Sequence, residues 1–272
     1  MPPPPSPTVL VFDSGLGGLT VFREVAAARP DAKLVYAADD AFFPYAARGE
    51  AELVARVVPL MGDLIARVAP DLVVIACNTA STLVLPQLRA EYQVPFVGTV
   101  PAIKPACASS TSKRVSVLGT EATVKREYTR ALIRDFSQGC EVTLVGSARL
   151  ASIAEHALRA EPVDEAEIAA EIAPCFVDDG ARRTDTVVLA CTHYPLLLDR
   201  LTRLSPWRVA WVDPAPAIAR RVVDLLGPPQ AGRPQGDTEA VALFSAARAP
   251  SRALVAALSG FGIKAIAGAP AI

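Results

Sequence analysis

The chain has 272 residues, of which 51% are hydrophobic and 20% are charged. This is a globular composition, long enough for one large domain or two small ones around a sizeable core. The formal net charge is −1, without a basic stripe or an acidic tail, which argues against nucleic acid or an anionic membrane as a partner and favours a small-molecule substrate.

The amino terminus reads MPPPPSP and has neither a basic segment nor an apolar core of the kind found in secretory signals. We expect residues 1–8 to form a disordered, proline-rich tip outside the fold. No uninterrupted apolar run reaches the roughly 18 residues that a membrane-spanning helix needs. These features predict a cytoplasmic protein.

Short apolar runs, many of them β-branched, recur between longer stretches rich in Ala, Leu, Arg and Glu. This alternation is typical of parallel strands that are covered on both faces by helices, so we predict an α/β fold. In chain order the predicted strands are Val9–Phe12, Leu34–Ala37, Leu72–Ala76, Val115–Leu118, Val142–Val145, Val187–Ala190 and Val209–Val212.

Two of these strands end in a cysteine. An offset of 114 residues superposes the strand before Cys77 on the strand before Cys191, and small polar residues follow each cysteine. The strands Val9–Phe12 and Val115–Leu118 also resemble each other. We therefore expect two similar α/β halves in a pseudo-twofold arrangement, in which Cys77 and Cys191 approach one ligand from opposite sides. In open parallel sheets, ligands bind beyond the carboxyl ends of the strands.

The five cysteines are an odd number with no CxxC pair, which predicts a reducing compartment and neither a disulfide framework nor a zinc site. For Cys107, Cys140 and Cys175 the expectation is a small buried core residue. Cys77 and Cys191 differ because hydroxyl, amide or imidazole groups follow them, so both are candidate catalytic groups. Neither is followed by the arginine of a CxxxxxR phosphatase loop.

The chain has only two histidines, and His193 stands two residues after Cys191. A histidine there can hold the proton of the neighbouring thiol near neutrality. Asp13 is the matching candidate beside Cys77, with the cap of the following helix as its alternative role. A hydrolase with a Cys/His/Asp arrangement stays open at this point, although it leaves the second cysteine unexplained.

The segment Asp13–Gly18 follows the first predicted strand and carries three glycines. Such a turn can offer backbone amides to an anion at the amino terminus of a helix. The spacing is not that of a dinucleotide-binding fingerprint, because Thr20 stands where the third glycine belongs, and no Walker lysine follows. We favour a carboxylate-binding turn over a nucleotide-binding one or a purely structural one.

Five short strings carry a likeness to a known family: Val11–Gly18, Pro44-Tyr45, Ala76–Ala80, Cys191–Leu196 and Val212-Asp213. Their sequence and order resemble the glutamate racemases of the aspartate/glutamate racemase superfamily, and the likeness runs from about Val9 to Ile266. A further set, Val100–Pro105, Gly119-Thr120 and Val124–Arg126, resembles the form found in Gram-negative bacteria.

This resemblance implies two Rossmann-like domains, formed by residues 9–98 plus 208–272 and by residues 99–207. It also implies cofactor-independent inversion of glutamate, with Cys77 and Cys191 as the acid/base pair and no metal. Asp13 would assist one thiol, and His193 with Glu155 the other. The implied substrate contacts fall on Asp13, Ser14, Tyr45, Ala46, Asn78, Thr79, Thr192 and His193.

The same resemblance implies a role in supplying D-glutamate for peptidoglycan, a cell-wall precursor as activator, and a homodimer. Ala46 replaces a glycine that is usual in the family, and would cost on the order of 1 kcal/mol if that position needs a positive φ. A racemase acting on aspartate or a hydantoin, a cysteine hydrolase and a non-enzymatic binding module are the alternatives.

Overall fold

The computed structural model describes residues 6–229, 240–247 and 249–268, and the chain divides into two compact units. The first unit comprises Met1–Thr99 and Ala215–Ile272, and the second comprises Val100–Pro214. The amino-terminal tip predicted over residues 1–8 lies mostly outside the described residues, but Thr8 already belongs to the first strand.

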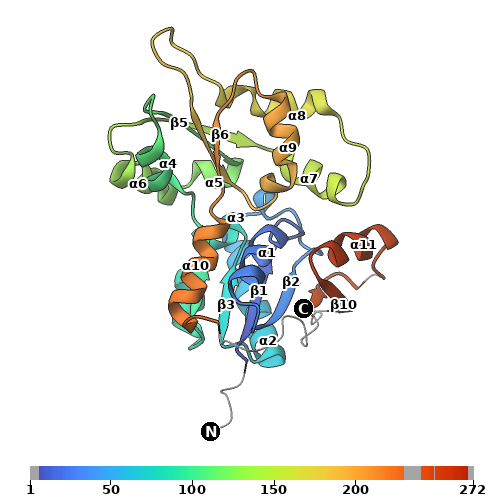
Figure 1. Ribbon diagram of the computed structural model, residues 1–272. Helices are drawn as coiled ribbons and strands as arrows, with labels where there is room; N and C mark the ends of the chain where they lie inside the picture. Colours follow the sequence, from blue (N-terminus) through green and yellow to red (C-terminus); the bar gives the residue numbers. More distant parts are fainter. Residues whose placement is uncertain (1–5, 230–239, 248, 269–272) are drawn as a thin grey trace. The chain divides into compact units, whose positions relative to one another are not determined.

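The first unit contains a six-stranded parallel sheet in the order β10-β9-β2-β1-β3-β4 (Figure 1). Its elements are β1 (Thr8–Asp13), α1 (Leu19–Ala28), β2 (Lys33–Ala38), the 3₁₀ helix η1 (Tyr45–Ala47), α2 (Glu50–Val68), β3 (Leu72–Ile75), α3 (Asn78–Glu91), β4 (Phe96–Gly98), α10 (Ala215–Leu226), β9 (Ala240–Phe244), α11 (Arg252–Gly260) and β10 (Ile263–Gly268).

The second unit contains a four-stranded parallel sheet in the order β6-β5-β7-β8. Its elements are α4 (Ile103–Ser109), β5 (Arg114–Thr120), α5 (Glu121–Lys125), α6 (Glu127–Phe136), β6 (Glu141–Ser147), α7 (Leu150–Leu158), α8 (Glu165–Ile172), η2 (Ala173–Cys175), β7 (Thr186–Ala190), η3 (Tyr194–Leu197), α9 (Leu198–Leu204) and β8 (Ala210–Val212).

The two sheets share one strand pattern. In each, the second strand of the unit lies outside the first, the third lies on its other side, and the fourth forms the edge. The strands that precede Cys77 and Cys191 are the third strands, β3 and β7, so the internal repeat expected from the sequence is confirmed. The larger sheet differs by the addition of β9 and β10 beyond β2.

Apolar side chains on alternate positions of the strands form the cores. In the first unit, Leu10 and Phe12 of β1 pack with Val73 and Ile75 of β3 against the buried faces of α2 and α3. On the smaller sheet, residues of β5 and β7 form separate clusters with α7 and with α4. Each sheet is thus covered by helices, as the continuous apolar runs predicted.

The boundaries between the units differ from the sequence expectation at two points. Thr99, expected in the second unit, belongs to the first. Residues 208–214, expected in the first unit, belong to the second, where β8 pairs with β7 through Thr186 and Ala210. Because that pairing makes β8 the edge of the smaller sheet, the chain returns to the first unit at Ala215.

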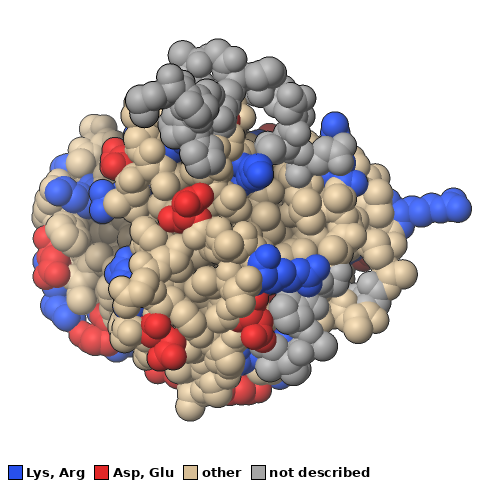
Figure 2. All heavy atoms as spheres, turned by 90° about the horizontal axis from the view of Figure 1, so that it is seen from below, with Lys and Arg blue, Asp and Glu red and all other residues tan. Residues whose placement is uncertain are grey.

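The surface has no dominant charge on the face shown in Figure 2, where acidic and basic side chains are interspersed. Among the described residues, no helix is both long and apolar enough to span a bilayer.

Candidate functional site

Cys77 lies at the carboxyl edge of the larger sheet, beside the end of β1. Residues Phe12 and Ile75 are paired in the adjacent strands, so the residues that follow them leave the sheet together. The Ser14 hydroxyl is 3.6 Å from the Cys77 sulfur, and the thiol is only 6% exposed. A hydroxyl at that distance can donate a hydrogen bond to a thiolate.

Asp13 is fully buried at the end of β1. Its Oδ2 accepts a hydrogen bond of 2.5 Å from the backbone N–H of Gly18, which is the residue before α1. A Cβ at Gly18 would lie 2.6 Å from the Asp13 Cβ, so this glycine is needed for close approach, whereas its φ of −59° is open to any residue. Asp13 therefore supports the amino terminus of α1 from the position that the sequence assigned to it beside Cys77.

Asn78 and Thr79 form the first turn of α3 directly after Cys77, and both are buried. Within the part of the chain that the structure describes, neither the oxygen nor the nitrogen of the Asn78 amide has a hydrogen-bond partner. A buried amide without partners costs about 1–3 kcal/mol, which a ligand with carboxylate or ammonium groups would recover. This makes Asn78 a candidate ligand contact.

Tyr45 is buried in η1 and donates a 2.8 Å hydrogen bond to Asp39 Oδ2. Burial and the adjacent Asp39 carboxylate raise the pKa of Tyr45 well above 10.0, so its hydroxyl stays neutral. Arg56 holds the same carboxylate with two hydrogen bonds, from Nε at 3.0 Å and from Nη2 at 2.7 Å. Ala46 lies within η1 and is not among the described non-glycine residues with a positive φ, so the alanine brings no strain there.

Cys191 lies at the corresponding edge of the smaller sheet, directly after β7, and is 6% exposed. The Nδ1 atom of His193 is 3.8 Å from its sulfur, and the Nε2 atom is 3.0 Å from Oε1 of Glu155 on α7. Because a carboxylate can only accept, Nε2 carries the proton and Nδ1 faces the thiol. Thr192 is buried between these two residues.

The electrostatics of this group favour a charged imidazole. Burial alone would lower the pKa of His193, but its hydrogen bonds with Cys191 and Glu155 raise the pKa well above 6.5. Glu155 in turn is paired with Arg159, whose Nη2 is 2.6 Å from Oε2. A thiol beside an imidazolium can transfer a proton at neutral pH.

The remaining cysteines behave as the sequence indicated. All five are free thiols, and Cys107, Cys140 and Cys175 are buried within the second unit. Burial raises the pKa of Cys107 and of Cys175 to about 12, so both remain protonated. No cluster of His, Cys, Asp and Glu suited to a metal ion occurs among the described residues.

The structure thus brings the predicted residues together in two groups, one in each unit. Asp13, Ser14, Asn78 and Thr79 surround or follow Cys77, and Thr192, His193 and Glu155 accompany Cys191. Sequence reasoning missed Asp39, Arg56 and Arg159. The available signals were a carboxylate directly after β2 and an arginine four residues after Glu155.

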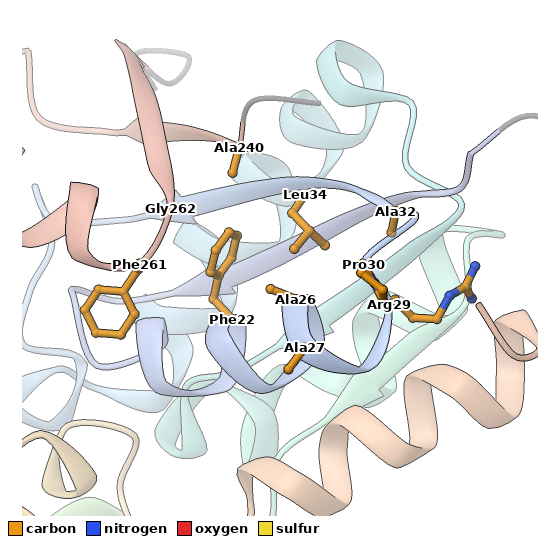
Figure 3. A pocket seen from close by; sticks show the side chains of 10 residues that line it. All are labelled: Phe22, Ala26, Ala27, Arg29, Pro30, Ala32, Leu34, Ala240, Phe261 and Gly262. Carbon is orange, nitrogen blue, oxygen red and sulfur yellow. The ribbon is translucent and has the colours of Figure 1, made fainter. Parts of the chain in front are cut away.

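A cavity elsewhere in the first unit is distinct from both groups (Figure 3). Phe22 and Ala26 of α1 and Leu34 of β2 line it, together with Ala240 and Phe261. These residues lie near the starts of β2, β9 and β10, at the opposite end of the strands from Cys77. None of the predicted site residues lines this cavity.

Comparison with known proteins shows the family of this chain. Residues 19–222 match the family described as Asp/Glu/Hydantoin racemase. The chain is 52% identical to the glutamate racemase of Brucella ovis over 96% of this chain and 94% of the relative. It is 53% identical to that of Brucella anthropi over 94% and 92% of the two chains.

A solved structure agrees. The glutamate racemase of Escherichia coli, solved in complex with L-glutamate and the activator UDP-MurNAc-Ala, superposes with a TM-score of 0.89 and 38% sequence identity. The match covers 98% of this chain and 100% of that one. Together with two related parallel-sheet units that each end a strand in a cysteine, these likenesses define an amino-acid racemase, an isomerase. More narrowly, the chain belongs to the Asp/Glu/hydantoin racemase family.

Proposed function

We propose that this chain interconverts L-glutamate and D-glutamate without a cofactor, with Cys77 and Cys191 each serving one face of the α-carbon. The observation that carries the proposal is the pair of thiols at equivalent strand ends, each with a polar side chain near its sulfur, Ser14 at 3.6 Å from Cys77 and His193 at 3.8 Å from Cys191. The high identity to curated glutamate racemases supports glutamate as the substrate over aspartate or a hydantoin.

In the proposed reaction, the Cys77 thiolate removes the α-proton of D-glutamate, and the Cys191 thiol donates its proton to the opposite face. One C–H bond breaks as an S–H bond forms, and one S–H bond breaks as the new C–H bond forms. L-Glutamate follows the reverse course. The reference pKa of cysteine, about 8.5, lies near the working pH, so a thiol and a thiolate can exchange these roles.

The surrounding residues would lower the cost of the carbanion. The buried Asn78 amide and the hydroxyls of Ser14, Thr79 and Thr192 can donate to the α-carboxylate, where negative charge develops. Asp13 would assist Cys77, and His193 with Glu155 would assist Cys191. Such fixed donors act in a buried setting, where they are worth more than in water.

The biological setting is part of the same proposal. The enzyme would supply D-glutamate for peptidoglycan in the cytoplasm, as a homodimer. The Escherichia coli structure was solved with UDP-MurNAc-Ala as activator, and we propose that a cell-wall precursor of this kind also activates this chain.

Circular dichroism of each glutamate enantiomer tests the activity. Protein dialysed exhaustively against chelator, with no pyridoxal phosphate added, should bring either enantiomer to a signal of zero. Aspartate and hydantoins should turn over far more slowly. An inactive dialysed protein that recovers only with an added cofactor would contradict the proposal.

Single-cysteine variants test the two thiols. Cys77→Ala and Cys191→Ala should each lower racemisation by roughly 10²–10⁴-fold or more, because one face loses its proton-transfer group. A glutamate analogue with a leaving group on the β-carbon needs only abstraction on one face. Cys77→Ala should therefore still eliminate from the L-configured analogue, and Cys191→Ala from the D-configured one.

The matched control is Cys140→Ala, which removes a buried thiol outside both groups and should keep the parent activity. If both catalytic-thiol variants were inert toward both analogues, or if either kept ordinary racemisation, the two-thiol assignment would be wrong.

A further inference from the structure

The carboxylate of Glu155 uses its two oxygens on two different partners. Oε1 is 3.0 Å from His193 Nε2, and Oε2 is 2.6 Å from Nη2 of Arg159. The side chains of Glu155 and His193 are 6% and 3% exposed, and that of Arg159 is 21% exposed. We propose that Arg159 is a positioning residue that fixes Glu155 and, through it, holds His193 toward Cys191.

The sequence builds this contact locally. Glu155 and Arg159 are four residues apart, so they lie on the same face of α7, one turn from each other. The helix ends at Leu158 and Arg159 is its cap, while Ala160 has a φ of +58°. The left-handed conformation of Ala160 ends α7 at this point. The Arg159 side chain lies beside the last turn of the helix, where it contacts Glu155.

Arg159 places a second cation beside a buried carboxylate that also faces His193. Removing one partner of a buried ion pair disfavours the charged form of the group that remains. Glu155 without Arg159 would therefore take up a proton more readily or rotate toward solvent, and the charged acceptor facing His193 Nε2 would be weakened or lost. The imidazole would then be free to turn away from the 3.8 Å contact with the Cys191 sulfur.

The effect should be confined to one thiol. Asp13, the carboxylate associated with Cys77, is held by the backbone N–H of Gly18 and belongs to the other unit. Arg159 therefore bears on proton transfer at Cys191 only. This part of the inference rests on the two-thiol function proposed above.

The first experiment measures elimination from the two β-substituted analogues by Arg159→Gln. The rate with the L-configured analogue, which uses Cys191, should fall by about tenfold or more in kcat with little change in KM, because general acid–base assistance is lost. The rate with the D-configured analogue should stay within about twofold of the parent, because proton abstraction by Cys77 does not depend on Glu155 or His193.

Two further variants complete this experiment. Arg159→Lys keeps a cation near Oε2 and should recover much of the lost rate. Arg134→Gln removes an arginine from an exposed ion pair with Glu127 in the same unit and should match the parent with both analogues. Equal losses with both analogues in Arg159→Gln, or no loss with either, would overturn the proposal.

The second experiment needs no substrate. The chain has only two histidines, and His156 is exposed, so an NMR titration of labelled imidazoles can follow the buried His193 by itself. In Arg159→Gln the pKa of His193 should fall toward its ordinary value because the charge of the facing carboxylate is weakened or lost. An unchanged or higher pKa of His193 would refute the positioning role.

The two experiments separate the two proposals. If the parent protein racemises no glutamate, the proposed function fails, yet the titration still tests whether Arg159 controls His193. If racemisation is confirmed and the titration shows no change, the proposed role of Arg159 is wrong while the proposed function stands.

Discussion

Two buried carboxylates that contact candidate site residues are each held by an arginine. Glu155 pairs with Arg159, and Asp39, which is fully buried, accepts two hydrogen bonds from Arg56. Asp39 also accepts from Tyr45, so the Arg56 pair fixes a residue that the proposed function places against the substrate. Charged groups that face apolar surroundings are retained only with such partners.

Replacing Arg56 should destabilise the first unit in a pH-dependent manner. Burial alone would raise the pKa of Asp39, but hydrogen bonds from Arg56, Ser245 and Tyr45 lower it below 3.8. The folded pKa is thus below the unfolded one, so the pair stabilises the protein above the unfolded pKa and this contribution is lost as the pH falls through the folded pKa. Arg56→Gln should cost about 3 kcal/mol at pH 7 and progressively less in acid.

Thermal unfolding at pH 7 and at successively lower pH checks this expectation. Arg23→Gln, which removes an exposed arginine, serves as the control and should change stability little at any pH. An Arg56→Gln penalty that is constant down to acid pH would show that Asp39 is not the group involved.

At the residue scale, the sequence indicates candidate site residues where the chemistry is local. Cys77, Cys191 and His193 stand out because polar residues follow the ends of apolar strands, and the structure places each at such a strand end. Glu155 was assigned only by family resemblance, because nothing local distinguishes it from a solvated helix carboxylate. The sequence does not indicate Arg56 and Arg159, because their role depends on the buried carboxylate that each contacts in the folded structure.

At the scale of elements, β4 packs closely against α3, the helix that begins directly after Cys77. A Cβ on Gly98 of β4 would press on Cδ1 of Leu85 and lie 2.6 Å from Oγ of Ser81. That same Oγ accepts a 2.7 Å hydrogen bond from the Thr99 backbone N–H. Glycine is required here for close approach between strand and helix.

Gly98→Ala should therefore destabilise the protein by about 1–3 kcal/mol through overpacking. Gly260→Ala in α11 is the matched control, because its added Cβ meets nothing within 4 Å and should be neutral or stabilising by up to about 1 kcal/mol. Denaturant unfolding of the two variants beside the parent provides the comparison. Equal stability of both variants would contradict the packing argument.

All seven strands predicted from the sequence are present, whereas β4, β9 and β10 were not foreseen. β4 has only three residues and follows Pro95, so its apolar run is too short to signal a strand. β9 pairs with β2, about two hundred residues earlier in the chain, and β10 in turn pairs with β9. Strand propensity depends on such partners, which no local window contains.

At the scale of the whole molecule, the second unit is an insertion in the first. The segment from Ala215 onward contributes α10, which packs on α1 (Figure 1), and the strands β9 and β10. In this sheet β9 covers the edge of β2 through Val35–Ala38. The integrity of the first unit therefore depends on the last part of the chain.

A chain that ends at Leu226 tests this dependence. It lacks β9, α11 and β10, so β2 becomes an unprotected edge with apolar neighbours, a known liability for aggregation. We expect the truncated protein to unfold at a lower temperature and to associate in sedimentation experiments. A monomeric truncated protein with the parent unfolding temperature would show that the two strands are dispensable.

The insertion also sets an order of events on the ribosome. Roughly 200 residues separate the emergence of β2 from that of β9, which at about 5–20 residues per second is a delay of roughly 10–40 s. Before this interval ends the inserted unit has all four of its strands, whereas the first sheet still has an open edge. The nascent chain thus completes the Cys191 half of the molecule first, and the Cys77 half, although its sequence is translated earlier, is the last to close.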